Sequence, residues 1–380
     1  MDLFNRLKNS TLKQPHSGIY FGVSASSGGA QEFMSATGGD ITTVGDYKIH
    51  TFTSVGTTTF TPTIGSDGTY GSKIDYVIVA GGGGGYCGGG GAGGLLTATN
   101  LVLTNTDYTM TVGDGGYSGQ CNVNAYGGNG VGGLSSIAGT GLTTITSTGG
   151  GFGGNHGGNT NTAGGSAGGG GGGGGAVAGG TSTSSPNQGN NGGSYDLATR
   201  FYSSFTTGSG ETTQAYSAPH SKTGSHRLGN IATIAAQDGY TVINERSATL
   251  AQARADTAPP TDYWASDAPF RLAEVPNSNN SGGGGGAGAV GSTLNGGAGI
   301  ANPITGSVIG EVSSGTYYLA GGGAGANTSS ASGGSGGVGG GGDYNAIGTA
   351  TFGGGGGGAD SGRRAAVGGS GVIIIKYKFQ

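Results

Sequence analysis

The segment DYVIVAGGGGGYCGGGGAGGLL (residues 75–96) joins an apolar run directly to glycine tracts. The run DYVIVA lacks polar alternation, which is typical of a strand that is buried on both faces. The last residues reverse this order, because GGSGVIIIKYKF (residues 368–379) places its glycines before an apolar strand. A flexible linker gives no reason for such anchoring. We therefore expect strands that enter and leave one packed layer in antiparallel directions.

Glycine makes up 96 of the 380 residues, and a collagen rod, disordered linkers or an ordered scaffold could use such a composition. Collagen is excluded, because no Gly-X-Y register is sustained and only 9 prolines occur. Ordering glycine costs ~0.5–1 kcal/mol more per residue than ordering alanine, so ordered tracts need a compensating role. Close packing of polyproline-II-type glycine helices provides one, since backbones without Cβ can pair N–H and C=O groups between neighbours. Wide glycine loops on a β-core, or disordered linkers, are the alternatives.

Short segments rich in β-branched and aromatic residues, separated by glycine and serine turns, predict antiparallel strands. These segments are Tyr47–Thr53, Thr57–Thr63, Asp75–Ala80, Leu95–Thr104, Tyr108–Gly116 and Leu142–Thr148. The predicted fold class is mostly β, with short antiparallel strands in a sandwich-like arrangement combined with a packed polyglycine-II helix bundle. A small mixed insertion with one helix completes the prediction.

Composition divides the chain into four parts, which are residues 1–40, 41–194, 195–277 and 278–380. The second and fourth parts are two glycine-rich halves, and the fourth ends in the closing strand. In the third part glycine is sparse and charge appears, so we interpret it as an insertion between the halves. Its segment NERSATLAQARADTAPP (residues 244–260) predicts a helix, which the two prolines end.

The first part, residues 1–40, is interpreted as an attachment segment. Its apolar residues Leu3, Phe4 and Leu7 have the spacing of a short amphipathic helix, which either docks on a partner or is a frayed terminus. The N-terminus lacks the 7–15-residue apolar core of a secretory signal. No run of ~18 apolar residues predicts a membrane span. We expect a protein that is either cytoplasmic or assembled inside a cell and released with a particle.

Charge and motifs exclude several classes of partner. A net charge of −4 disfavours nucleic acid, and Arg363 with Arg364 after a glycine is a single pair rather than an RGG array. No Walker A sequence is present, and His220 and His226 are too far apart for a common zinc motif. We expect no cofactor and no metal. The cysteines, Cys87 and Cys121, either form a disulfide or are small residues tolerated in a tight scaffold.

Carboxylates and aromatic residues are the remaining candidates for a functional site. Insertion carboxylates could act as a glycosidase acid and nucleophile, but solvated loop charges explain them more simply, so we predict no enzyme. Those carboxylates are Asp256, Asp262, Asp267 and Glu274. Aromatic side chains that interrupt glycine or polar sequence suit stacking on sugars or anchoring at a receptor, although each could instead cap the small core. The candidate receptor-binding residues are Tyr86, Tyr117, Tyr126, Phe201, Tyr202, Tyr263 and Trp264.

The order of these segments resembles the glycine-rich tail-fibre and adhesin proteins of tailed bacteriophages, especially those of marine hosts. The resemblance spans Gly45–Phe379 apart from the insertion. It is carried by GDYKIHTFTSVGTTTF (45–60), DYVIVAGGGGGYCGGGGAGGLL, YTMTVGDGG (108–116) and GGSGVIIIKYKF. The chain departs from these proteins in lacking a long fibrous shaft and in carrying the insertion, so fibre, tip protein and capsid-attached fibre all stay open.

The resemblance implies stacked glycine helices whose distal loops contact a host cell-surface receptor, either a polysaccharide or an outer-membrane protein. It also implies a homotrimer on the virion surface that joins other virion proteins through its N-terminus, without membrane insertion. A purely structural virion or extracellular-fibre protein, such as a capsid decoration, is the main alternative. An ice- or carbohydrate-binding protein would favour a strict three-residue repeat and a signal peptide, and the sequence has neither.

Overall fold

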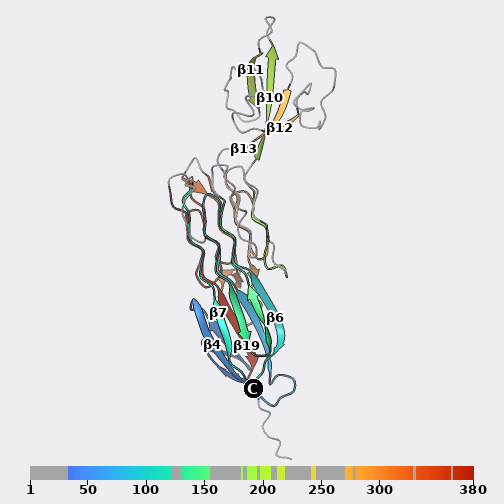
Figure 1. Cartoon of the computed structure of the whole chain (residues 1–380), viewed down its shortest axis with the longest axis vertical. Helices are drawn as coiled ribbons and strands as arrows, with labels where there is room; N and C mark the ends of the chain where they lie inside the picture. Colours follow the sequence, from blue (N-terminus) through green and yellow to red (C-terminus); the bar gives the residue numbers. More distant parts are fainter. Residues whose placement is uncertain are drawn as a thin grey trace, which may run out of the picture.

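Two antiparallel five-stranded sheets form a β-sandwich at the end of the molecule where the C terminus lies (Figure 1). The computed structural model describes residues 33–121, 130–154, 181–182, 186–194, 280–327, 331–360 and 363–380, and the backbone of four strands between 197 and 276. One sheet has the order β1 (Ser35–Thr37), β4 (Gly56–Thr63), β7 (Tyr108–Val112), β8 (Ser135–Gly139), β9 (Leu142–Ser147). The other has the order β2 (Asp40–Val44), β3 (Tyr47–Phe52), β19 (Val372–Lys378), β5 (Lys73–Val79), β6 (Leu95–Val102).

Strand β19 is the centre of the second sheet. It pairs antiparallel with β5, where Val372 lies opposite Val79, and antiparallel with β3 on its other side. Its alternate residues Ile373, Ile375 and Tyr377 are buried between the two sheets. Each fully buried side chain of this size contributes about 1.5–3 kcal/mol. The strand VIIIKYK therefore joins the N-terminal and C-terminal parts of the chain into one core.

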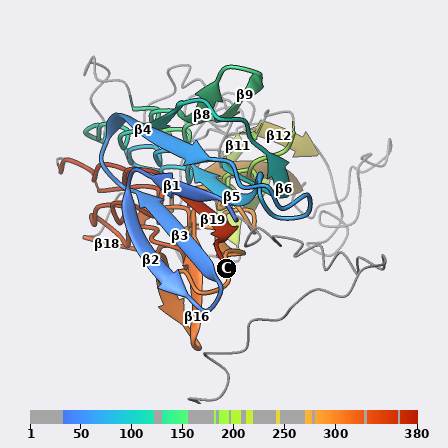
Figure 2. The same cartoon turned by 90° about the horizontal axis from the view of Figure 1, so that it is seen from below.

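The opposite face of the same sheet is also covered. Val372, Ile374 and Val79 pack there in a second cluster with Leu319 and Ala320. Leu319 belongs to a small sheet with the order β14 (Ile300–Ala301), β16 (Thr316–Leu319), β15 (Glu311–Ser313). Figure 2 looks along the molecule from the sandwich end, with β4 and β8 on one side of β19 and β16 on the other. Burial on both faces explains why DYVIVA and VIIIKY have no polar alternation.

The prediction of a mostly β fold with short antiparallel strands is confirmed. None of the described residues forms a helix that could span a membrane. The helix predicted at residues 244–260 lies almost wholly outside the described residues, as does the N-terminal helix with Leu3, Phe4 and Leu7. Within 195–277 the backbone forms a separate antiparallel sheet with the order β11 (Thr212–Ala218), β10 (Leu197–Thr206), β13 (Phe270–Pro276), β12 (Thr241–Asn244).

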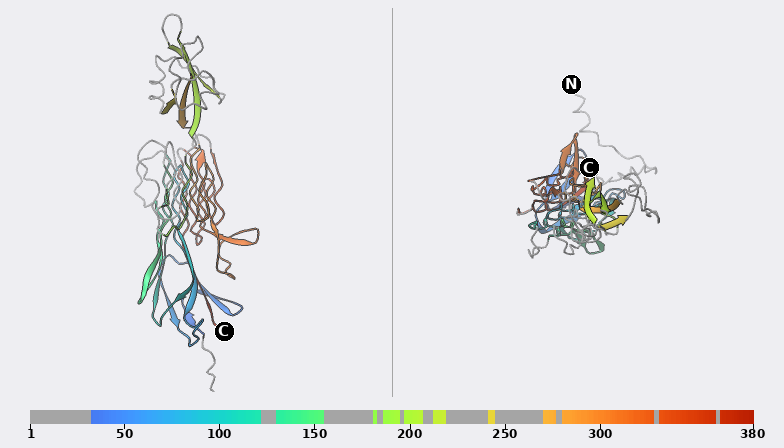
Figure 3. Two further views of the ribbon diagram at one scale, coloured as in Figure 1. Left: turned by 90° about the vertical axis from the view of Figure 1, so that its right-hand side faces the viewer. Right: turned by 90° about the horizontal axis from the view of Figure 1, so that it is seen from above.

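Beyond the sandwich, glycine segments from both halves of the chain run side by side (Figure 3). Backbone hydrogen bonds join them, and we call them the glycine region. It comprises residues 81–94, 113–119, 130–134, 149–154, 188–194, 281–299, 320–325, 334–342, 353–359 and 365–371. Their N–H and C=O groups thus find partners in other segments, which buried backbone requires.

The hydrogen bonds of the glycine region repeat every three residues. The five amides of Gly81–Gly85 donate in order, at 2.8–2.9 Å, to the carbonyl oxygens of Gly133, Gly369, Gly91, Gly130 and Ala366. The first and fourth acceptors share one segment, and the second and fifth share another. The amides of Gly88, Gly91 and Gly94 likewise return to a single segment, at Gly154, Gly151 and Thr148. The amides of Gly81–Gly85 thus donate to three neighbouring segments, and their carbonyl oxygens accept from three more, at Gly150 and Gly153, at Gly116 and Gly119, and at Gly356.

The tract glycines are required for close approach rather than for backbone conformation. None of Gly81–Gly85 has a φ in the left-handed region. A Cβ on Gly82 would overlap the carbonyl oxygen of Gly354, and a Cβ on Gly83 would overlap that of Gly151. Real Cβ atoms do not approach backbone so closely, so alanine would have to push a neighbouring segment away. The glycine composition is thus explained by the close packing of backbones against neighbouring segments.

A glycine turn at residues 339–340 is different, because it needs left-handed backbone. Gly339 and Gly340 have φ values of 106° and 91°. Their amides both donate to one carboxylate oxygen, Oε2 of Glu311, at 2.7 and 2.8 Å. A carboxylate held by successive amides is a recurring anion arrangement. Glu311 thereby ties β15 to the glycine region.

A buried histidine gives the sandwich a pH-dependent stability. His50 donates from Nδ1 to the Gly38 carbonyl oxygen at 2.7 Å, and its Nε2 lies 3.2 Å from the Tyr377 hydroxyl. Desolvation by burial, supported by the nearby Lys48 charge, lowers the pKa of His50 despite the bond to Gly38. A lowered folded-state pKa means that stability is complete above the unfolded pKa of about 6.5 and is lost as the pH falls below it.

We therefore expect the free energy of unfolding to fall between pH 7 and pH 5. Each unit by which the folded pKa lies lower contributes about 1.36 kcal/mol to the total loss. The His50→Gln variant should be less stable at pH 7 but should show a flatter profile over this window. Urea unfolding at several pH values measures both slopes. Parallel profiles for the two proteins would contradict the assignment to His50.

Candidate binding surface

The loops at the end of the glycine region farthest from the sandwich form the candidate binding surface. The pairing of residues shows in which direction the glycine segments run. Val79 pairs with Val372 in the sheet, and farther along the chain the amide of Gly82 donates to Gly369 and that of Gly85 donates to Ala366. Each step along the first segment therefore moves away from the sheets. Residues 86–87 connect an outgoing to a returning segment at this far end, where Asp360 and Arg363 also lie.

A disulfide between Cys87 and Cys121 joins two of these loops. Both cysteines are buried, and the bond closes a loop with a sequence separation of 34. The sequence left this pairing open, because only two cysteines occur and their spacing decides nothing. The cross-link fixes the loop after residue 119 to the turn at residues 86–88.

Tyr86, one of the candidate receptor-binding residues, lies against these loops. Its ring packs on Phe152, with ring centroids 5.6 Å apart, and on Gly119, where a Cβ would overlap the ring. Burial raises the pKa of its hydroxyl, which keeps it protonated. The Tyr86 carbonyl oxygen also accepts the amide of Ala359 at 2.7 Å. Tyr86 is therefore half-buried and supports the loops.

The other aromatic candidates fall into three groups. Tyr117 is 59% exposed and is available for contact from the glycine region. Phe201 and Tyr202 lie in β10, opposite Leu272 and Arg271 of β13, where only the backbone is described. The remaining candidates, Tyr126, Tyr263 and Trp264, lie outside the described residues. Of the seven candidates, only Tyr86 and Tyr117 have described side chains, and both belong to the glycine-rich half before the insertion.

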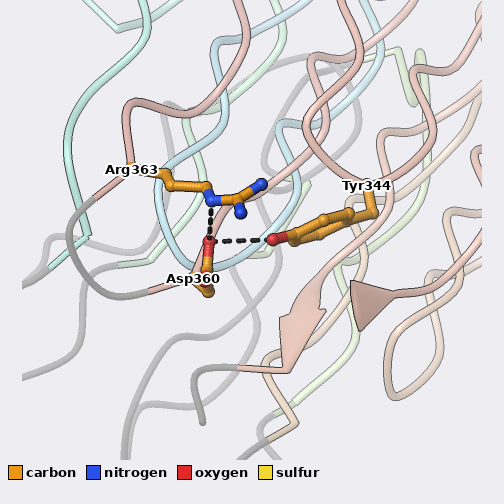
Figure 4. Close-up of polar contacts among 3 residues, drawn as sticks. All are labelled: Tyr344, Asp360 and Arg363. Atoms are coloured by element: carbon orange, nitrogen blue, oxygen red, sulfur yellow. Dashed lines mark hydrogen bonds and ion pairs between the residues drawn. The ribbon is translucent and has the colours of Figure 1, made fainter. Parts of the chain in front are cut away.

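Tyr344, Asp360 and Arg363 form a polar cluster at this end of the glycine region (Figure 4). Asp360 Oδ1 accepts a hydrogen bond from the Tyr344 hydroxyl at 2.8 Å and lies 3.4 Å from Arg363 Nε. Burial is the main cause of a raised pKa of the Tyr344 hydroxyl, and the hydrogen bond to Asp360 is the second. The hydroxyl therefore stays protonated and can donate. Next to this cluster, Arg364 forms a β-bridge with Gln120. The bridge places the two arginines beside the loop that carries the disulfide.

Sequence reasoning considered Arg363 and Arg364 only as evidence about nucleic acid and did not select Tyr344. The partners of these residues are distant in sequence, so no spacing rule could have assembled the cluster. A usable signal was present, however. Arg363 and Arg364 are the only Lys or Arg residues in the long glycine-rich segment 272–375.

The described residues contain no group of three or more His, Cys, Asp or Glu side chains placed to hold a metal ion.

No curated protein matched the chain in the sequence comparison. A family model for a glycine-rich domain matches residues 53–302, about two thirds of the chain. The matched part includes β5, the segments of the glycine region from 81–94 to 281–299, and the sheet formed by β10, β11, β12 and β13. The chain therefore belongs to this glycine-rich domain family.

Proposed function

We propose that the chain is a fibre or adhesin protein of a tailed bacteriophage, which is carried on the virion surface and binds the host cell surface without enzymatic activity. The observation that carries this proposal is the hydrogen-bonded glycine region, which holds cross-linked loops at the end opposite the sandwich. A scaffold of this kind suits the display of contact loops, because binding and catalytic residues are disproportionately found on loops held by rigid frames.

The glycine region is proposed to be a bundle of packed polyglycine-II helices. Its three-residue hydrogen-bond period supports this, because polyproline-II-type helices have three residues per turn and no internal hydrogen bonds. The absence of left-handed φ values in Gly81–Gly85 is in keeping with it. In such a bundle stiffness comes from backbone pairing with the surrounding segments rather than from a side-chain core.

The partners follow from the sequence resemblance and are part of the same proposal. The N-terminal residues Leu3, Phe4 and Leu7 would join other virion proteins, and the protein would be a homotrimer assembled in the host cytoplasm. The receptor would be a polysaccharide or an outer-membrane protein. The aromatic residue Tyr117 and the insertion 195–277 would contribute to contact with it.

Excision of the insertion tests where binding resides. The pairing of Leu197 with Pro276 brings the two ends of its sheet together, so a short Gly-Ser linker can replace residues 195–277. We expect the excised protein to unfold at the same denaturant concentration as the full chain but to lose binding to marine bacterial cells, measured by flow cytometry of the labelled protein. Retained binding would overturn the role of the insertion. Absence of binding by the full chain to every strain of a broad panel would overturn the adhesin proposal in favour of a purely structural protein.

A further inference from the structure

Outside the sandwich strands, the only Lys or Arg residues of the two glycine-rich halves are Arg363 and Arg364. No Lys or Arg occurs between Lys73 and Arg200, and between Arg271 and Lys376 only Arg363 and Arg364 occur. The four lysines with described side chains, Lys48, Lys73, Lys376 and Lys378, lie in the sandwich strands. The candidate binding surface thus carries an isolated pair of arginines in a chain with a net charge of −4.

Backbone contacts hold Arg363 and Arg364 in place, while their side chains are exposed to solvent. Arg364 bridges Gln120, and the amide of Ala365 donates to the Gly119 carbonyl oxygen at 2.9 Å. The Arg363 side chain is 53% exposed and approaches Asp360 only through Nε. Figure 4 joins Arg363 to Asp360 through Nε, and the two terminal nitrogens form no ion pair with any other described residue. Arg364 is exposed as well.

A purely structural role does not account for this arrangement. An ion pair with a half-exposed arginine contributes little, typically 0–1 kcal/mol, and the Tyr344 hydroxyl already satisfies the same Asp360 oxygen. Arg364 makes no ion pair with any described residue. Two consecutive arginines with exposed side chains are instead suited to a planar anion, because the guanidinium fork matches carboxylate geometry.

We propose that Arg363 and Arg364 bind the carboxylate groups of an acidic polysaccharide, with Asp360 accepting a sugar hydroxyl. The inference rests on the proposed function, because it names the receptor class of that same surface. Asp360 favours a sugar over a polyphosphate, since its carboxylate accepts hydroxyl donors, which a sugar offers and a polyphosphate lacks. Two cations on an acidic chain are also too few for nucleic acid, whose binding depends on many phosphate contacts.

The test uses the full-length protein and immobilised polygalacturonate, a polymer of carboxylate sugars, with affinity measured by biolayer interferometry. The Arg363→Ala/Arg364→Ala variant should bind about 10- to 100-fold more weakly, because hydrogen bonds to charged groups are lost at both residues. The Arg363→Lys/Arg364→Lys variant should show an intermediate loss, since it keeps the charge without the fork. Lys73→Ala removes a charge at the sandwich end and should change the affinity less than twofold. Neutral dextran should not bind.

The outcomes separate this inference from the function on which it rests. Equal affinity of the double-alanine variant and the parent protein, with matched urea unfolding curves, would overturn the arginine site. Stronger binding to dextran sulfate than to polygalacturonate would overturn the assignment to carboxylate sugars. Binding to host cells without any binding to polygalacturonate would overturn the inference and leave the adhesin function standing. Arginine-dependent binding to polygalacturonate without binding to any cell would support the site and count against the adhesin function.

Discussion

Replacing Gly83 by alanine is expected to lower the free energy of unfolding by about 3 kcal/mol or more. The added Cβ would overlap the Gly151 carbonyl oxygen, and backbone cannot turn aside as a flexible side chain can. Overpacking a well-packed core already costs about 1–3 kcal/mol, and here a neighbouring segment must move as well. Urea unfolding measures the loss. Amide hydrogen exchange should show weaker protection of Gly91, which donates to Gly151, and of Gly150, which donates to Gly81.

Gly68 provides a matched control for this substitution. It is exposed in the loop before β5, its φ lies outside the left-handed region, and a Cβ there would meet nothing within 4 Å. Gly68→Ala should therefore leave stability unchanged or raise it by about 0.4–1 kcal/mol, because alanine reduces the entropy of the unfolded chain. The two substitutions are chemically identical, but only Gly83→Ala is expected to destabilise the protein. Equal effects at both positions would contradict the close packing described for the glycine region.

The Cys87→Ser/Cys121→Ser variant is expected to lose about 3–4 kcal/mol of unfolding free energy. The cross-link closes a loop with a sequence separation of 34, and the chain-entropy model gives a value of this size for such a loop. Denaturant unfolding of the oxidised parent protein and of the variant measures the difference.

Reduction of the parent protein with dithiothreitol is the internal control, because it removes the bond without changing the sequence. The reduced parent and the serine variant should unfold at similar denaturant concentrations. Tyr86 and the loop at 119–120 should also exchange amide hydrogens faster in both, since the bond holds these loops together. If the serine variant were as stable as the oxidised parent, the cross-link would make no contribution to the loops at the far end.

The apolar strands of the fold were predictable from sequence because their burial is visible in composition. DYVIVA and VIIIKY lack polar alternation, and they are direct neighbours in the sheet with Val79 opposite Val372. Strands such as β2, with the sequence DITTV, were missed because all five residues are exposed and carry no burial pattern. Strand β7 is shorter than its predicted segment because the chain continues past Val112 into the glycine region at Gly113.

The candidate binding surface was predicted less completely, for a physical reason. A glycine tract carries no side-chain pattern, so the sequence does not reveal which tracts are neighbours or which loops meet. Tyr344 and Asp360 come together only because the amide of Asn345 donates to Gly358 and that of Gly357 donates to Ala346. Aromatic residues were selected by their isolation in the sequence, which does not distinguish a supporting ring such as Tyr86 from an exposed one such as Tyr117.

The central position of β19 has a consequence for biosynthesis. This strand is the last of the described strands to leave the ribosome, and it pairs with β3 and β5, which are made about 300 residues earlier. At 5–20 residues per second those partners wait for roughly 15–60 s with an unsatisfied edge. Long-range pairing of this kind is slow and leaves strands open to aggregation. Nascent chains that stall before Val372 are expected to be targets for chaperones and proteases, because the sheet closes only after translation has passed β19.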